Sequence, residues 1–367
     1  MTLDRRDFMK AGAAVAVGAL MPGAAMAQTA FAPTPGVWRK FQLTTRLEIA
    51  QPKGRTQAWV PLPSFNAPDW FHPSGSTWRT NAATAMLARD PKYGAGMLYL
   101  QWDAGEPEPG AEITSRFAVR DRAIDLTAPG SVPALSAQER RLYLEATDLI
   151  PTDGIVKATA DRITAGAGSD LAKARAIYEW VVDNTFRDAA TRGCGSGDVA
   201  AMLRTGNLGG KCADLNALFV GLARAVGIPA RDVYGLRIAP SKFGYRSLGA
   251  ETEIVSKAQH CRAEVWLAGF GWVPADPADV RKVALEEPPG NLPLSDARVV
   301  AVRDKLFGAW ETNWLAYNVA HDVRLPWSEG PALGFLMYPQ AETASLRLDC
   351  LDPDTFRYAL KATELPA

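Results

Sequence analysis

The chain has few of the residues that ordinarily bind transition metals, since its 367 residues include only three histidines and four cysteines. No two cysteines are spaced as C-x-x-C and no two histidines as H-E-x-x-H, the spacings typical of zinc sites. Four cysteines, one of them a candidate reactive group, also do not make a disulfide framework for a chain of this length. We therefore expect no metal, no other cofactor and at most one disulfide.

The sequence also lacks net charge, with 40 basic and 40 acidic residues, so it has no basic excess of the kind that binds nucleic acid. After the N-terminal segment, no apolar run reaches about 18 residues, the length that spans a bilayer. These absences exclude a nucleic-acid partner and a stable membrane span in the mature form. What remains is an ordinary globular enzyme or binding protein.

The first feature that is present is an export signal. Asp4–Lys10 reads DRRDFMK, a twin-arginine pattern, and the apolar segment Ala11–Met21 and the small residues Ala25-Met26-Ala27 follow it. The apolar segment is too short, and too rich in alanine and glycine, for a membrane helix. We predict that residues 1–27 are a twin-arginine signal peptide cleaved after Ala27, and that the mature protein is periplasmic.

Cys212 is the first candidate for a reactive group. The apolar residues that follow it recur at helical spacing, and Gly227 and Pro229 then end the pattern. Cys212 is thus placed on the first turn of a buried helix, where unpaired N–H groups and the helix dipole favour a thiolate. The alternative is a cysteine that only packs at a tight junction between a loop and a helix, and a nearby base is needed to decide between the two.

Of the three histidines, His260 has the setting expected of that base. It opens His260–Leu267, an alternating stretch typical of a strand, and a glycine-rich turn then leads into a second arm, Trp272–Pro277. Asp276 on that arm can orient the imidazole only if the strand register brings both side chains to one face. A four-residue turn puts them on opposite faces, so we predict a bulge or an odd-length loop.

The other cysteines and histidines are weaker candidates. Cys194 lies in a glycine-rich loop before the helix, and a plain loop position is favoured over a place in the cleft. Cys261 follows His260 on the strand, so it is expected to point away from it into the core, and the pair is unsuited to share a metal ion. His72 and His321 are expected to be structural.

Three blocks of the sequence resemble the transglutaminase-like superfamily, which includes transglutaminases and related cysteine peptidases and amidases. They are Gly209–Arg231, His260–Trp266 and Gly271–Pro277, and their order and separation are also similar to those of that family. The resemblance implies an α+β fold with a papain-like transglutaminase core. In such a core, a helix carrying the cysteine packs on an antiparallel sheet that carries the histidine and the aspartate.

The resemblance also implies roles for the three residues: Cys212 as nucleophile, His260 as general base and acid, and Asp276 as the group that orients His260. A thiolate and imidazolium pair of this kind performs acyl transfer through a thioester and needs no metal. The implied function is a periplasmic cysteine-dependent enzyme acting on peptide or side-chain amides, as a protease, an amidase or a transglutaminase. Cell-wall peptides are candidate substrates. The alternative is a catalytically inactive member that serves as a binding module of the cell envelope.

The remaining pattern predicts the domain organisation. Segments rich in β-formers at residues 43–49, 56–62 and 112–119 predict a small β-sandwich over 35–126. A linker with one helix is expected over 127–168, the transglutaminase-like core over 169–285, and a C-terminal extension packed on that core over 286–367.

Overall fold

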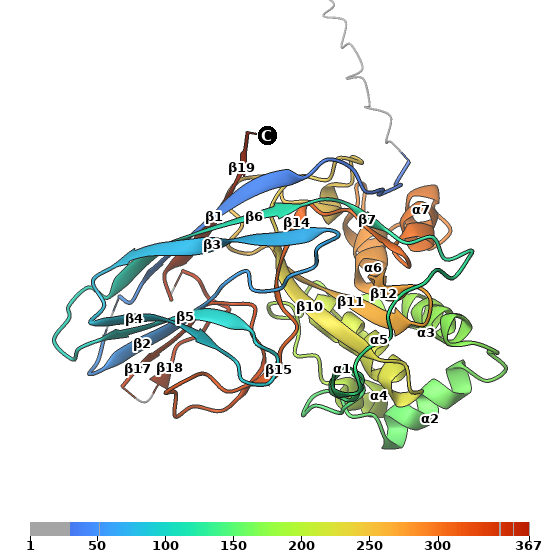
Figure 1. The fold of residues 1–367 in the computed structure, drawn as a ribbon, viewed down its shortest axis with the longest axis horizontal. Helices are drawn as coiled ribbons and strands as arrows, with labels where there is room; N and C mark the ends of the chain where they lie inside the picture. Colours follow the sequence, from blue (N-terminus) through green and yellow to red (C-terminus); the bar gives the residue numbers. More distant parts are fainter. Residues whose placement is uncertain (1–29, 51, 345, 355, 367) are drawn as a thin grey trace, which may run out of the picture.

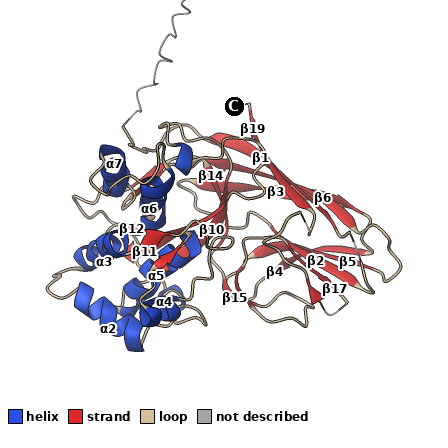
Figure 2. Ribbon diagram, turned by 180° about the vertical axis from the view of Figure 1, so that it is seen from behind, coloured by secondary structure: helices blue, strands red, loops and turns tan. Residues whose placement is uncertain are grey.

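The computed structural model of the chain describes residues 30–50, 52–344, 346–354 and 356–366, so the predicted signal peptide lies outside the described residues. One half of the molecule is built from two β-sheets, and the other from helices around a third sheet (Figure 1). Figure 2 shows the larger helices gathered at one end. No helix among the described residues is long and apolar enough to cross a membrane.

Two antiparallel sheets form the β-rich half. The first has the order β19 (Tyr358–Leu365), β1 (Arg39–Glu48), β6 (Gly110–Val119), β3 (Phe71–Thr80), and the second has the order β18 (Leu346–Arg347), β17 (Gln340–Thr343), β2 (Thr56–Pro61), β5 (Gly96–Trp102), β4 (Thr84–Arg89). Buried and more exposed residues alternate along most of β1. Its inward residues, such as Phe41, share one apolar cluster with Leu100 of β5 and Phe117 of β6. The two sheets therefore bury a common core between them.

The C-terminal part of the chain completes both of these sheets. Strand β19 pairs with β1, and β17 pairs with β2. The segment 286–367, expected to pack on the core region, thus also belongs to the β-rich half. The pattern of the sequence could not show this, because strands so far apart in the chain pair without any local turn to mark them.

The third sheet forms the centre of the other half. Its antiparallel order is β12 (Gly271–Ala275), β11 (Gln259–Leu267), β10 (Ala230–Arg237), β14 (Trp314–Asn318). Helix α5 (Cys212–Ala225) packs against β10 and β11, and α2 (Gly154–Ile163), α3 (Asp170–Asn184), α4 (Val199–Thr205) and α6 (Pro277–Glu286) surround it. Every residue of α5 is buried. Gly227, with φ of 83°, lies just beyond its end, which confirms the predicted stop.

Short elements connect these parts. They are α1 (Ala137–Leu142), η1 (Arg246–Leu248), α7 (Ala297–Lys305), and the pairs β7 (Arg122–Ala123) with β13 (Ala309–Trp310), β8 (Phe186–Arg187) with β9 (Gly209–Gly210), and β15 (His321–Val323) with β16 (Leu333–Phe335). The core is continuous between the halves, because the ring of Trp70 stacks on that of Trp314, with centroids 6.2 Å apart.

Candidate active site

Cys212 is the first residue of α5, as the sequence predicts. The carboxylate of Asp214, in the same turn, accepts hydrogen bonds from the backbone N–H groups of Ser196 (3.0 Å), Gly197 (2.9 Å) and Lys211 (3.0 Å). The N–H of Ala213 donates to the carbonyl of Cys194 over 2.9 Å. These bonds fix the glycine-rich loop against the start of the helix. The negative charge of Asp214 lies at the positive end of the helix dipole, which favours it.

Gly195 allows this loop to approach the helix so closely. Its φ is 95°, and a Cβ atom added to it would lie 1.8 Å from Oδ2 of Asp214. We expect Gly195→Ala to lower the free energy of unfolding by about 3 kcal/mol, because the strain of the backbone and the steric clash add. Gly206 is a matched control, since its φ is 70° but the space around it is open, and Gly206→Ala should cost only about 1 kcal/mol. Equal losses in denaturant titrations of the two variants would contradict the close approach.

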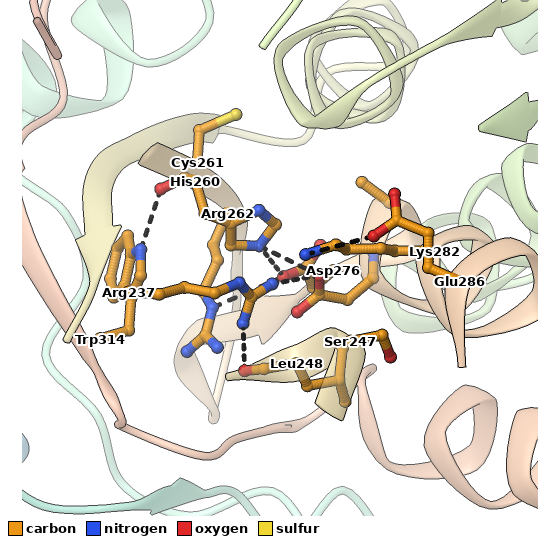
Figure 3. Close-up of polar contacts among 12 residues, drawn as sticks. Arg237, Ser247, Leu248, His260, Cys261, Arg262, Asp276, Lys282, Glu286 and Trp314 are labelled. Carbon is orange, nitrogen blue, oxygen red and sulfur yellow. Dashed lines mark hydrogen bonds and ion pairs between the residues drawn. The ribbon is translucent and has the colours of Figure 1, made fainter. Parts of the chain in front are cut away.

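His260 lies near the start of β11, and the odd-length loop predicted after this strand is present. Leu267 pairs with Gly271, so three residues connect β11 to β12, and Ala263 pairs with Ala275. This register brings Asp276, the next residue, to the side of the histidine. Oδ2 of Asp276 lies 2.8 Å from Nε2 of His260 (Figure 3). The bond leaves Nδ1 as the imidazole nitrogen available to a second partner.

Asp276 also begins the next helix, because its Oδ1 accepts the N–H of Asp279 over 3.1 Å and thereby caps α6. The same oxygen lies 3.2 Å from Nδ2 of Asn216. Asn216 in turn donates to the carbonyl of Cys261 over 2.8 Å, so it connects α5 to β11. The helix carrying the thiol, the strand carrying the imidazole and the carboxylate are therefore held by one buried network.

A second layer of charge surrounds this network. Oδ1 of Asp279 lies 3.4 Å from Nε2 of His260 and is ion-paired with Arg237, while Nε of Arg262 lies 3.5 Å from Oδ2 of Asp276. Although burial raises it, Arg237 and His260 hold the pKa of Asp279 well below its usual value. Burial and Arg237 lower the pKa of His260, but the carboxylates of Asp279 and Asp276 outweigh them and raise it to about 9.

The sequence analysis did not identify Asn216 or the residues of this second layer, although their spacing offered signals for several of them. Asn216 is four residues after Cys212 on one helix face, and Asp279 is three residues after Asp276 in the first turn of a helix. Arg262 is two residues after His260 and therefore on the same side of the strand. Arg237 carries no such signal, because its strand is joined to the others only by tertiary pairing.

Cys212 is surrounded by polar groups that favour its thiolate. The neighbouring thiols of Cys194 and Cys261, followed by the nearby His260, hold the pKa of Cys212 well below its usual value. The thiol of Cys194 donates to the carbonyl of Gln259 over 3.3 Å.

The sequence favours a plain loop position for Cys194, and this prediction is wrong. Hydrogen bonds to Asp214 hold the loop of Cys194 against the start of the helix. The thiol of Cys194 therefore lies in the same buried cluster as Cys212. Cys261 is fully buried as expected, but it belongs to this cluster too. All four cysteines are free.

Cys212 and His260 are each only 3% exposed, but both line a cavity of about 390 Å³. The cavity walls come from the loop of Cys194, from residues 256–258 before β11 and the first residue of that strand, and from C-terminal residues that include Tyr338, Leu351 and Tyr358. The thiol and the imidazole are therefore both at the wall of one cavity.

His260, Asp276 and Asp279 are the one group within the described ranges that offers three metal-ligating atoms, all within 4.8 Å of one another. Arg237 and Arg262 already neutralise the two carboxylates at contact distance. A divalent cation would lie beside two guanidinium groups, which repel it. The donor set therefore fits an ion-pair network better than a metal site.

Comparison with known proteins places this geometry in a family. Residues 157–277 match the model of the transglutaminase-like superfamily, and residues 2–22 match that of the twin-arginine translocation signal, so the chain carries an export signal. An uncharacterised protein of Haemophilus influenzae is 39% identical over 338 residues, which are 87% of this chain and 89% of that protein. A crystal structure from Cytophaga hutchinsonii, named "Putative Cysteine Protease", has the same fold. Its TM-score is 0.56 at 13% identity, over 92% of this chain and 94% of that one. The chain carries a core of the transglutaminase-like superfamily.

Proposed function

We propose that the protein is a cysteine-dependent acyl-transfer enzyme, with Cys212 as nucleophile, His260 as general acid and base, and Asp276 as the group that orients His260. The observation that carries the proposal is the arrangement of the three groups at and behind the cavity wall. The Cys212 thiol and the His260 imidazole line one cavity, and Nε2 of that imidazole is 2.8 Å from the carboxylate of Asp276. A nucleophile, a base and an orienting acid in this order are the machinery of acyl transfer.

In the first half of the reaction, the Cys212 thiolate attacks the carbonyl carbon of an amide. The N–H of Cys212, one of the unpaired donors at the helix start, is the first proposed partner of the resulting oxyanion. As the C–N bond breaks, imidazolium His260 gives its proton to the leaving amine. The products of this half are a free amine, neutral His260 and a thioester on Cys212.

In the second half, an acceptor attacks the thioester while His260 takes its proton. Water as acceptor yields a carboxylate, and an amine yields a new amide, with the thiolate and the imidazolium restored in both cases. The two outcomes are hydrolysis and transamidation. With the export signal, we place the reaction in the periplasm and take peptides, those of the cell wall included, as substrates.

The proposal is tested with a library of peptide amides incubated with the protein at several pH values. Products and covalent protein adducts are read by mass spectrometry. We expect an acyl adduct on Cys212 alone and, for a substrate found in this way, a bell-shaped dependence of kcat/KM on pH. The rate rises as Cys212 deprotonates below the usual pKa of a thiol, and it falls through the His260 pKa of about 9 as the imidazolium is lost.

Two results would contradict the proposal. A rate that climbs steadily through pH 9 is the behaviour of an ordinary thiol without a protonated partner. Peptides that bind without forming any adduct or product would instead support the binding-module alternative.

A further inference from the structure

The walls of the cavity carry charge of one sign. Of the described residues that line it, five are Lys or Arg and none is Asp or Glu: Arg187, Lys211, Arg237, Lys257 and Lys282. The chain as a whole is formally neutral, so this is a local excess. A cleft with one sign of charge concentrates ligands of the opposite sign. The lining of this cavity therefore favours ligands that carry negative charge.

Three of these cations lie close to the nucleophile in the fold. Lys211 directly precedes Cys212. Arg187 pairs with Gly210 in the parallel contact of β8 with β9, two residues before Cys212. Lys282 lies on α6, one turn after Asp279. We call Arg187, Lys211 and Lys282 the cationic wall.

The carboxylates of the protein do not balance the cationic wall. Glu286 is shared, since it is ion-paired with Arg187 and its Oε2 lies 3.7 Å from Nζ of Lys282 (Figure 3). No carboxylate of the described residues lies within ion-pair distance of Lys211. The other two cations each have a carboxylate partner of their own. Arg237 is ion-paired with Asp279, and Nζ of Lys257 lies 3.3 Å from Oδ2 of Asp354. Within ion-pair distance, the wall thus holds three positive charges against one carboxylate.

The positive charge of Lys282 is costly when no ligand is bound. Its side chain is only 17% exposed. Burial, followed by repulsion from Arg237, lowers the pKa of Lys282 to about 8. An anion bound in the cavity would relieve both effects, because it replaces lost solvation and opposes the repulsion.

Building on the proposed function, we propose that the enzyme selects amide substrates with a carboxylate close to the scissile bond, and that Lys211, Lys282 and Arg187 bind it. In a peptide, that carboxylate is either an acidic side chain or the free C-terminus. Both present the same group to the wall, and hydrogen bonds between ionised partners are stronger than neutral ones.

The test compares peptide substrates that differ only in this charge. One pair carries Glu or Gln beside the scissile amide, and a second pair ends in a carboxylate or a carboxamide. We expect kcat/KM to favour the acidic member of at least one pair by about 10- to 100-fold at low salt, and the preference to shrink as salt screens the charges. The pair that shows the preference identifies the source of the carboxylate.

Lys211→Gln and Lys282→Gln should each reduce the preference severalfold, and the double variant should bring it close to one. Lys157→Gln is the matched control, because this lysine lies on α2, has 48% side-chain exposure and is outside the cavity lining. Thermal unfolding of each variant checks that it folds. Equal kcat/KM for both members of both pairs would overturn the inference.

A binding measurement keeps this inference separate from the proposed function. The Cys212→Ala protein is mixed with equal amounts of acidic and amidated peptides, and the retained fraction is identified by mass spectrometry. We expect enrichment of the acidic peptides, and loss of that enrichment when Lys211→Gln and Lys282→Gln are added. Retention without charge preference refutes the inference even if Cys212-dependent turnover exists. Charge preference without an acyl adduct in the wild type refutes the proposed function alone.

Discussion

Replacing Cys212 with alanine is expected to lower kcat/KM for the amide substrate by about 10⁴-fold or more, because in the proposed mechanism this residue forms and breaks the bond to the acyl group. The neighbouring thiols cannot substitute for it. Hydrogen bonding to Cys212, followed by burial, raises the pKa of Cys194, while burial, followed by that hydrogen bonding, raises the pKa of Cys261. Of these three clustered thiols, only that of Cys212 therefore has a lowered pKa.

The measurement is steady-state turnover of the purified variant and of the wild type on one peptide found in the library. Cys350→Ala is the matched control, since Cys350 is also a free cysteine but does not line the cavity. It should keep kcat/KM within about threefold of wild type. Turnover by Cys212→Ala at more than a tenth of the wild-type rate would exclude a thioester on this residue.

His260→Gln is expected to lower kcat/KM by about 10³-fold, because the leaving amine then lacks its proton donor and the thiolate loses its cationic partner. The same substitution should raise the pKa of Cys212, so alkylation by iodoacetamide at pH 6 slows. Turnover and alkylation report on different steps, and a variant with impaired folding is recognised by its thermal unfolding curve. Both rates should fall in a folded His260→Gln protein.

The control for this prediction is His72→Gln. His72 lies on β3, where its ring contacts that of Trp38 with centroids 4.5 Å apart, and it does not line the cavity. Its replacement should leave turnover and alkylation unchanged. If His260→Gln alkylates at pH 6 as fast as wild type, the imidazole does not sustain the thiolate, and the neighbouring thiols alone would have to explain its low pKa.

The local arrangement of the site could be predicted because each part has a short-range cause. Helical spacing after Cys212 and the glycine stop at Gly227 define a helix, and its first turn positions the thiol. The alternation of side chains along the strand fixes the face on which His260 lies. Asp276 reaches that face when the loop between the two strands has an odd number of residues. The loop has three residues, so this condition is met.

What could not be predicted depends on contacts between distant segments. The loop of Cys194 has no periodicity, and hydrogen bonds to Asp214 place it. The pairing of β19 with β1 joins residues from the two ends of the described chain, with no turn between them. Residues such as Tyr358 reach the cavity only through that pairing, so the lining of the cavity is a property of the whole fold.

The pairing of β1 with β19 also determines the order in which parts of the chain can fold. The first sheet cannot close until residues 358–365 have left the ribosome, and Leu351, Pro353 and Tyr358 of the cavity wall arrive at the same late stage. Such long-range pairing makes folding slow. Twin-arginine export carries folded proteins, and residues 2–22 match such a signal. A nascent chain therefore holds Cys212 without a finished cavity until residues 351–358 have been made and β19 has paired with β1.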